Sequence, residues 1–498
     1  MKGRILPLAK LICLGVLLSL VKDGELFFAK GYGYADLKNR ERVVVDETLF
    51  RVGSVGKPFT ATAVMQLVEE GKLDMHHTTT RQPLPPELAE NLALGYTYAN
   101  GGYEAERFEF YQTAPAGSMS ATATDMAHFM ISHLQNGRYG DERILQEDTA
   151  EEMHRRHFGH DPRVNGLAYG FAQFDRNDQR IIGWGGDTTL FHSRLVLLPE
   201  QDAGLFFSYN SAGGEEARDE LFGAFLDRYY PVPDSPAKTS ATDFRERAGG
   251  FAGSYGSTRA SQTTPEKLNA LRGTLNVSAS GDAALLTRRT LGGQPQRWVE
   301  VEPLVFREVD GQGNMRQENM VFRENGQGRV THLFFGGSTT VAYARLAWYE
   351  TPALHVGLLA VCAALFLSAI VLWPIGALRD RGKGGAGTPR PGPSCLARWL
   401  AGGTGALSLL YLIGYALVLS ASDPLELAYG DPPLLRVVEV LPFPIVVLAL
   451  GALVLVVPVW IRRYWSVAGR VHYTVVALAG LGFVWFLYYW NLLEELWY

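Results

Sequence analysis

The C-terminal part of the chain carries four long apolar segments, which constrain its fold more than any other feature of the sequence. The segments span residues 352–373, 401–421, 440–461 and 473–490. Each is close to the ~20 residues that an α-helix needs to cross the hydrocarbon core of a bilayer. Because that core offers no water to exposed backbone groups, such segments are expected to be helical. We therefore predict a four-helix transmembrane domain over residues 352–498.

Charged residues between these segments predict the orientation of the domain. The first and third connections are basic, with Arg379, Arg381, Lys383, Arg390, Arg398, Arg462, Arg463 and Arg470. The second connection and the C-terminal tail are acidic, with Asp423, Glu426, Asp431, Glu494 and Glu495 against a single Arg436. Since basic loops remain in the cytoplasm, the preceding part of the chain is expected on the extracytoplasmic side. The net charge of −5 gives no argument for a nucleic-acid partner.

Outside the apolar segments, Ser54-Val55-Gly56-Lys57 carries the clearest chemical signal. These residues begin an apolar helical pattern that continues to Gly71. A serine hydroxyl is a weak nucleophile at neutral pH and needs a base within hydrogen-bond distance. A lysine three residues later on a helix lies on the same face and can supply that base. Alone, the pattern is weak evidence, because most such serines only begin a helix beside a solvated lysine.

Three segments of the chain resemble the class C β-lactamase and penicillin-binding-protein-like serine hydrolases. Residues 48–74, TLFRVGSVGKPFTATAVMQLVEEGKLD, resemble the first active-site segment of that family. Residues 114–127 resemble the stretch that enters its later helices, and residues 183–188 stand where the family has its third motif. The resemblance covers residues 22–230 and implies an α+β fold in which helices cover an antiparallel sheet.

The resemblance also implies an activity and the residues that perform it. Family members transfer the acyl group of an amide, lactam or ester to a serine and then release it to water or an amine. Ser54 would be the nucleophile, Lys57 its base, and the backbone N–H groups of Ser54 and Asp187 the oxyanion hole. Substrate binding would fall to the third motif, Trp184, Gly185, Gly186 and Asp187. Small esters, β-lactams and peptidoglycan-like peptides are the implied substrates, and neither a metal nor a cofactor is implied.

The sequence departs from the family pattern in two places. A Tyr-x-Asn motif should follow a long helical lobe, but that lobe is missing from the sequence, and Tyr98-Ala99-Asn100 runs into two glycines typical of a turn between strands. Trp184 takes the place of a lysine or histidine, and an indole can donate a hydrogen bond but cannot relay a proton. Three functions remain open: a hydrolase with weak turnover, a degenerate membrane binding or sensory protein, and a transporter or scaffold with a vestigial ectodomain.

The N-terminal residues support two interpretations that conflict. Residues 1–20 have a basic start and an apolar core, as a secretory signal does, but no small-x-small cleavage site follows them. Residues 16–21 and 25–33 instead predict two strands joined by a turn at Asp23-Gly24. Further strands of the same sheet are predicted over residues 180–182, 194–198 and 205–209, with a closing helix over residues 215–230.

The remaining boundaries follow from composition. A proline-rich linker, residues 231–242, ends the hydrolase-like domain, residues 21–230. Residues 243–347 alternate short strand-like runs with turn signals and predict a small all-β barrel or sandwich. Its strands are predicted over residues 251–255, 274–278, 283–287, 298–306, 320–323, 330–335 and 340–344.

Two further patterns carry little chemistry. The three cysteines, at positions 13, 362 and 395, provide no disulfide framework for the presumed extracytoplasmic part. His154, His157 and His160 have the spacing of neighbours on one helical face, but Gly159 and Pro162 interrupt a helix there. We therefore do not predict a metal site at these histidines.

Overall fold

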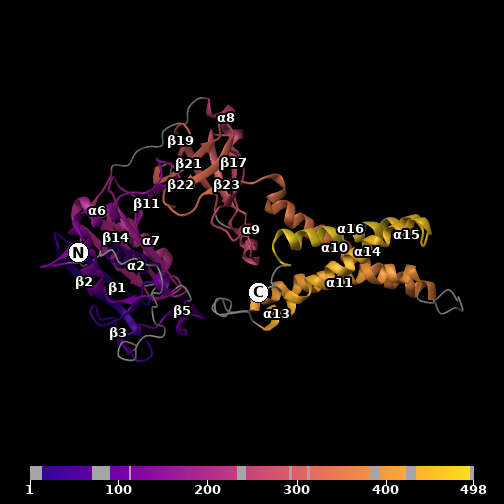
Figure 1. Ribbon diagram of the computed structural model, residues 1–498, viewed down its shortest axis with the longest axis horizontal. Coiled ribbons are helices and arrows are strands. Elements are labelled where there is room, and N and C mark those ends of the chain that lie inside the picture. Colours follow the sequence, from indigo (N-terminus) through magenta and orange to yellow (C-terminus); the bar gives the residue numbers. More distant parts are fainter. Residues whose placement is uncertain are drawn as a thin grey trace.

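The computed structural model describes residues 14–69, 90–111, 114–232, 243–290, 294–310, 315–381, 392–421 and 433–493. Figure 1 shows three parts along the molecule: a domain of strands and helices, a small barrel, and a bundle of long helices. This is the α+β domain, all-β domain and helical membrane domain that the sequence predicts.

A nine-stranded antiparallel sheet forms the framework of the N-terminal domain, in the order β10-β11-β12-β13-β14-β15-β1-β2-β3. Its long strands are β13 (Ile182–Asp187), β14 (His192–Leu198), β15 (Ala203–Tyr209), β1 (Gly15–Lys22) and β2 (Glu25–Asp36). Its short strands are β10 (Phe158–Gly159), β11 (Gly166–Leu167), β12 (Ala172–Gln173) and β3 (Glu41–Arg42). Every residue of β15 is buried, as expected for a central strand that is covered on both faces.

Helices cover both faces of this sheet. Helix α5 (Ala123–Leu134) contacts β15 and β1, whereas α7 (Gly214–Tyr229) contacts β14 and β15. Along β14, Leu195 and Leu197 belong to the core beneath α5, while Val196 and Leu198 belong to the core beneath α7. Successive side chains of a strand point to opposite faces, so one apolar strand supplies both cores. The predicted arrangement of helices over an antiparallel sheet is confirmed.

Strand β1 lies inside the sheet. For the residues described, the N-terminal apolar segment is therefore a strand of the domain, one of the two interpretations that the sequence allowed. It pairs with β15 on one side and β2 on the other. Asp23 and Gly24 form the predicted turn, with φ of 52° and 74°. The signal-like interpretation of residues 1–20 is therefore corrected for residues 14–20, because their apolar side chains serve a central strand. Residues 1–13, including Cys13, lie outside the described residues.

Residues 253–345 form a closed barrel of eight strands. The strands are β16 (Gly253–Ser257), β17 (Leu275–Ser280), β18 (Ala284–Arg289), β19 (Gln296–Glu302), β20 (Val305–Val309), β21 (Met315–Glu324), β22 (Val330–Phe335) and β23 (Tyr343–Arg345). The single strand predicted over residues 298–306 is in fact two, because Leu304, with φ of 67°, turns the chain between β19 and β20. Helix α8 (Phe244–Phe251) packs Phe244 and Phe251 into the barrel core.

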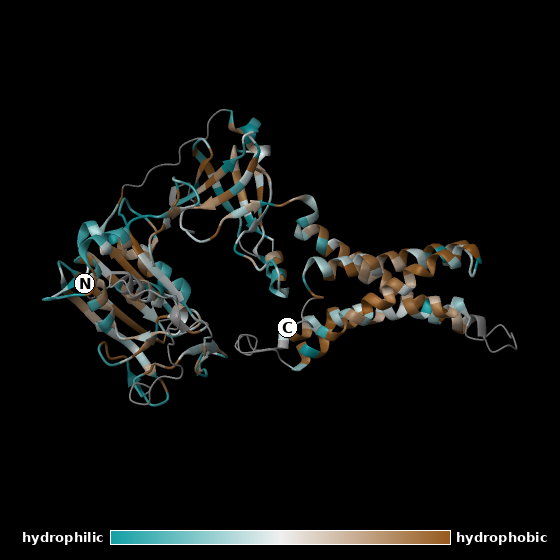
Figure 2. Ribbon diagram, viewed as in Figure 1, coloured by the Kyte–Doolittle hydropathy of each residue, from teal (hydrophilic) through white to brown (hydrophobic). Residues whose placement is uncertain are grey.

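The C-terminal part contains four helical spans that are long and apolar enough to cross a membrane: Pro352–Leu378, Pro393–Val418, Pro433–Ile461 and Val467–Tyr489. They belong to α10 (Pro352–Arg381), α11 (Pro393–Ala421), the series α13 (Pro433–Val440), α14 (Pro442–Val454) and α15 (Val456–Ile461), and α16 (Val467–Tyr489). Prolines at 442, 444 and 458 accompany the breaks in the third span. Figure 2 shows hydrophobic residues along all these helices, and side chains such as Val447 and Ile461 are 68% and 75% exposed. An exposed apolar surface of this extent suits contact with lipid.

Candidate active site

Ser54 lies in a 3₁₀ turn, η1 (Gly53–Val55), directly before helix α2 (Gly56–Glu69). The α-helix thus begins two residues later than predicted. Residues three apart eclipse one another in a 3₁₀ turn, so the spacing still brings the two side chains together. Lys57 Nζ donates a hydrogen bond to Ser54 Oγ at 2.6 Å. The predicted helix end at Gly71 lies outside the described residues.

The Lys57 ammonium is held in a partly desolvated position. Its Nζ also donates to the carbonyl oxygen of Ala116, at 3.3 Å, in the short helix α4 (Ala114–Gly117). Burial lowers the pKa of Lys57 below its ordinary value, and the positive charge of Arg259 lowers it further. A lower pKa increases the fraction of neutral amine near neutral pH. The contact with Ser54 and the direction of the pKa shift are those expected of a general base.

Two glycines let strand β13 cross closely over the turn that carries Ser54. Gly53 has φ of +54°, and a Cβ there would lie 3.1 Å from the backbone nitrogen of Asp187. A Cβ on Gly186 would lie 2.0 Å from the carbonyl oxygen of Val52 and 3.0 Å from the backbone nitrogen of Ser54. A side chain at residue 186 is incompatible with this crossing. The crossing brings the backbone of β13 close to Ser54.

The backbone N–H of Asp187 is turned towards this crossing. Its neighbour Thr188 donates its N–H to the carbonyl oxygen of Phe191 at 2.9 Å. Hydrogen-bonded and non-hydrogen-bonded pairs alternate along an antiparallel ladder, so the N–H of Asp187 points away from β14. The backbone nitrogens of Ser54 and Asp187 therefore both lie at the contact between the Gly53 turn and β13. Two neighbouring N–H groups are the arrangement expected of an oxyanion hole.

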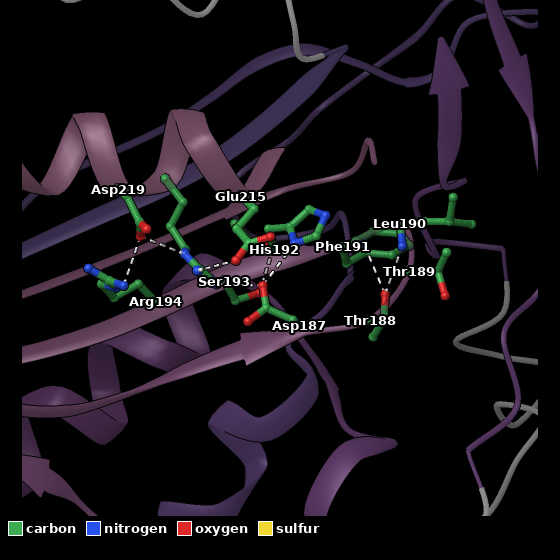
Figure 3. A network of polar contacts seen from close by, with 12 residues as sticks. Asp187, Thr188, Thr189, Leu190, Phe191, His192, Ser193, Arg194, Glu215 and Asp219 are labelled. Atoms are coloured by element: carbon green, nitrogen blue, oxygen red, sulfur yellow. Dashed lines mark hydrogen bonds and ion pairs between the residues drawn. The ribbon is translucent and has the colours of Figure 1, made fainter. Parts of the chain in front are cut away.

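The Asp187 carboxylate lies in a polar network beneath α7. It accepts hydrogen bonds from His192 Nδ1, at 2.8 Å, and from Arg218 Nη1. Burial favours the neutral acid, but the hydrogen bonds from His192 and Arg218 outweigh it and hold the pKa of Asp187 below its ordinary value. Figure 3 shows this network continuing to Arg194 and Asp219, which are 2.8 Å apart. The charged network anchors the end of β13, and sequence reasoning missed it.

Trp184 lies on the same side of β13 as Gly186, two residues away. Lys57 Nζ is 5.9 Å from the centre of its indole ring. The aromatic ring therefore lies beside Lys57, at the position where the family resemblance implies a lysine or histidine.

Tyr98 lies in the predicted turn region and away from the cleft beside Ser54. It belongs to the hairpin of β5 (Tyr96–Ala99) and β6 (Gly102–Ala105), in which Asn100 and Gly101 have positive φ. Its side chain is 62% exposed, and its ring packs edge-on against Tyr103 at 5.2 Å. No tyrosine is among the described residues that line the cleft.

The three histidines of the His-x-x-His-x-x-His run lie in three different environments. His154 is buried and shares a 3.0 Å hydrogen bond with His133. The ring of His157 stacks on Tyr169, and that of His160 stacks on Phe334 of the barrel. No group of three potential metal ligands occurs within the described residues.

A cavity of about 1540 Å³ opens beside Ser54, between the sheet domain and the barrel. On the sheet-domain side it is lined by Ser54, Lys57, Trp184, Gly185 and Asp187, all of which the sequence predicts for the site. The opposite wall comes from the barrel and includes Arg259, Glu318, Ser338 and Thr339. No local sequence pattern marks these barrel residues, because only the docking of the two domains brings them to the site.

Comparisons with known proteins agree with the expected family. Residues 9–82 and 72–227 match the family model described as Beta-lactamase. The esterase EstB of Burkholderia gladioli is 36% identical over 81 residues, which cover 16% of this chain and 20% of EstB. Protein flp of Staphylococcus aureus (strain NCTC 8325 / PS 47) is 31% identical over 67 residues, 14% of this chain and 13% of that protein. The matched region thus spans a fifth or less of these relatives.

Two solved structures resemble the chain more broadly but weakly. The crystal structure of SurE is 20% identical, with a TM-score of 0.44, and the similarity covers 67% of this chain and 95% of SurE. The octameric penicillin-binding protein homologue from Pyrococcus abyssi is 16% identical, with a TM-score of 0.38, over 66% of this chain and 96% of that structure. Scores this low do not by themselves establish a common arrangement of domains.

Proposed function

We propose that the protein is a membrane-anchored serine hydrolase of the β-lactamase and penicillin-binding-protein-like family. The match of residues 9–82 and 72–227 to the family model described as Beta-lactamase supports this proposal. The proposed reaction is acyl transfer from an amide, lactam or ester to Ser54, followed by release to water. The observation that carries this proposal is the 2.6 Å contact between Lys57 Nζ and Ser54 Oγ, at a lysine whose pKa is lowered by burial.

The steps follow from the positions of these groups. The neutral Lys57 amine takes the proton of Ser54 as Oγ attacks the carbonyl carbon. The resulting oxyanion accepts hydrogen bonds from the backbone N–H groups of Ser54 and Asp187. The Lys57 ammonium then returns its proton to the leaving group, which departs as the acyl-enzyme forms. Water attacks this ester in the second half of the reaction, again with Lys57 as base.

Kinetics with a neutral ester test this proposal. We expect Ser54→Ala and Lys57→Met to lower the kcat/KM of the full-length protein for p-nitrophenyl butyrate by about 10³-fold or more. Ser338→Ala is the matched control, because Ser338 lines the same cleft from the barrel. Equal rates for wild type and Ser54→Ala would remove the assignment.

A second candidate is a binding or sensory protein without turnover. It is favoured by Trp184, whose indole stands beside Lys57 in place of a proton-relaying group, and by the lack of a tyrosine among the described residues of the cleft wall. Such a protein would bind an acyl compound in the cleft but would show no difference in ester hydrolysis between wild type and Ser54→Ala.

We also propose that the hydrolase domain faces the extracytoplasmic side. The basic first and third connections of the membrane domain support this orientation. A reporter enzyme that works only in the cytoplasm should be active when inserted in the loop of residues 379–398 and silent when fused after residue 498. The reverse pattern would overturn the orientation.

A further inference from the structure

The helical bundle has one end beside the barrel and a far end, where α16 begins at Val467. Lys267 of the barrel donates to the carbonyl oxygen of Tyr489 at 2.7 Å, so the C-terminal end of α16 lies beside the barrel. The first residue of α16 lies roughly 35 Å further along the bundle, because the helix has 23 residues. Figure 1 shows α15 at the far end as well. The two basic connections of the membrane domain join the helices at this far end.

The third connection carries positive charge without an acidic residue nearby in the sequence. Residues 441–493 contain Arg462, Arg463 and Arg470 but neither aspartate nor glutamate. Among the residues that the structure describes, no carboxylate forms an ion pair with any of these three arginines. The far end is therefore a region of positive potential, which attracts anions.

Two arginines at the far end lie on indole rings. The guanidinium carbon of Arg398, in α11, is 4.6 Å from the centre of the Trp465 ring. That of Arg470, in α16, is 4.9 Å from the centre of the Trp460 ring, whose Nε1 donates to Thr474 Oγ1 at 3.0 Å. A cation–π contact orients a guanidinium without using its hydrogen-bond donors. Both arginines therefore have defined positions at the far end.

Contacts between helices fix the indole beneath the first of these arginines. Trp373 Nε1 of α10 donates to His472 Nδ1 of α16 at 3.0 Å, and His472 Nε2 lies 2.9 Å from Ser368 Oγ of α10. The Tyr473 ring packs against Trp373 and Trp465, with ring centres 6.3 Å and 5.4 Å apart. Polar contacts between helices stabilise their association in lipid. Trp465 is thus held by two packed helices.

Exposed tryptophans indicate the depth of this cluster in a membrane. Trp399 is 74% exposed and Trp460 is 40% exposed. Tryptophan is enriched where a membrane meets water, at the level of the lipid headgroups. Because the apolar spans also end here, the guanidinium groups of Arg398 and Arg470 are expected at the level of the lipid phosphates.

We propose that Arg398 and Arg470, stacked on Trp465 and Trp460, form a binding site for the phosphate of an anionic phospholipid. Arginine binds phosphate oxygens through charge-assisted hydrogen bonds. A lipid is favoured over a soluble anion because the exposed apolar surface of the same helices suits its acyl chains. In the proposed orientation the site faces the cytoplasmic leaflet, which carries the anionic lipids. The inference rests on the spans crossing a membrane and is independent of hydrolysis at Ser54.

Native mass spectrometry of the full-length protein in a neutral detergent tests the site. The probes are dioleoyl phosphatidylglycerol, which is anionic, and dioleoyl phosphatidylcholine, which is zwitterionic. Wild type should bind the first phosphatidylglycerol at least about tenfold more tightly than phosphatidylcholine, since each arginine at an anionic membrane surface contributes about fivefold. Arg398→Gln/Arg470→Gln should reduce this ratio to about twofold or less, and Arg398→Lys/Arg470→Lys should retain part of it.

Arg462→Gln/Arg463→Gln is the matched control. It removes the same charge from the same end, but neither arginine lies on an indole ring in the described part of the chain. Its ratio should stay within about twofold of the wild-type ratio. Equal losses in the two double variants would show a diffuse effect of charge and overturn the site, as would a wild-type ratio near one.

Two further measurements decide the identity of the ligand and the integrity of the variants. Displacement of phosphatidylglycerol by an excess of ammonium phosphate would identify a soluble anion as the ligand and overturn the lipid assignment. Unchanged binding of phosphatidylcholine to Arg398→Gln/Arg470→Gln shows that the bundle is intact. If that binding changes, the single variants Arg398→Gln and Arg470→Gln decide, since each should lose about fivefold in the ratio. A wild-type ratio in both single variants would contradict the proposal.

Discussion

The two walls of the cleft differ in how the sequence encodes them. The wall that carries Ser54 is built from a three-residue spacing to Lys57 and from a backbone crossing at Gly53 and Gly186. The facing wall is built from barrel loops, including Arg259, which reach the cleft only because Val164 packs on the barrel. The contact between Ser54 and Lys57 is thus specified by local geometry, whereas the facing wall of the cleft depends on the docking of a second domain.

Among the variants that compare the two walls, the largest effect is expected from Gly186→Ala, which closes the backbone crossing beside Ser54. In Gly186→Ala the new Cβ would lie 2.0 Å from the carbonyl oxygen of Val52, so β13 must move away from Ser54. We expect ester hydrolysis to fall about 100-fold or more, as for loss of an oxyanion-hole donor. Gly102→Ala, in the hairpin strand β6, is the matched control, because its Cβ would meet no heavy atom within 4 Å. Similar rates for the two variants would contradict the assigned crossing.

An intermediate effect is expected when the facing wall is undocked. Val164→Asp places a charge in the buried contact with Phe334 and Val321, where it has no partner. We expect the Tm of the full-length protein to fall by about 5 °C or more, while hydrolysis of the neutral p-nitrophenyl ester changes less than about threefold. Val164→Ile should leave both measurements near the wild-type values. A large loss of ester hydrolysis in Val164→Asp would show that the Ser54 wall depends on the docked barrel.

A smaller change is expected from Trp184, whose ring centre lies 5.9 Å from Lys57 Nζ on the same wall of the cleft. Trp184→His restores a group that can relay a proton, and hydrolysis of an ester or lactam should rise up to about tenfold, a part of what a positioned acid or base contributes. Trp184→Phe serves as control, since it keeps an aromatic ring without a titratable group. An unchanged rate in Trp184→His would favour the binding protein over the enzyme.

The smallest expected effect is on the stability of the folded protein. His133 and His154 share a buried hydrogen bond in the N-terminal domain. Burial and then the charge of Arg180 lower the pKa of His154 to about 4. The unfolded chain, near the ordinary value of 6.5, binds this proton more readily, so the stabilisation is present above pH 6.5 and is lost as the pH falls towards 4.

Thermal unfolding at several pH values measures this linkage. His154→Gln should reduce the fall in Tm between pH 6.5 and 4. Each 1 kcal/mol of pH-dependent unfolding free energy that His154 contributes corresponds to roughly 2–4 °C in Tm. His128→Gln, at an exposed histidine on α5, is the control. An identical slope in wild type and His154→Gln would exclude a role for His154 in acid sensitivity.

The predictions from sequence succeeded where short-range pattern and local geometry coincide. The strands around Asp23-Gly24, the helical start at Ser54 and the apolar spans each depend on neighbouring residues, and the structure contains all of them. The split of β19 from β20 at Leu304 was missed, because an apolar run gives no sign that a non-glycine residue adopts positive φ.

Features that depend on tertiary contacts could not be predicted. Arg218 lies far along the chain from Asp187, yet the two are joined beneath α7. In the same way, Arg259 carries no motif, and its relation to Ser54 exists only once the barrel is docked. The apolar residues 14–20 resembled an export signal because a buried central strand and a signal core share the same composition.

The central claim is that Ser54 is the group that becomes acylated, and peptide mapping by mass spectrometry after reaction with a fluorophosphonate or a labelled penicillin tests it most directly. The account predicts an adduct on the peptide that contains Ser54 in the full-length protein, formed faster as the pH rises and Lys57 loses its proton, and no such adduct in Ser54→Ala. An adduct on a different residue, or labelling that persists in Ser54→Ala, would contradict it.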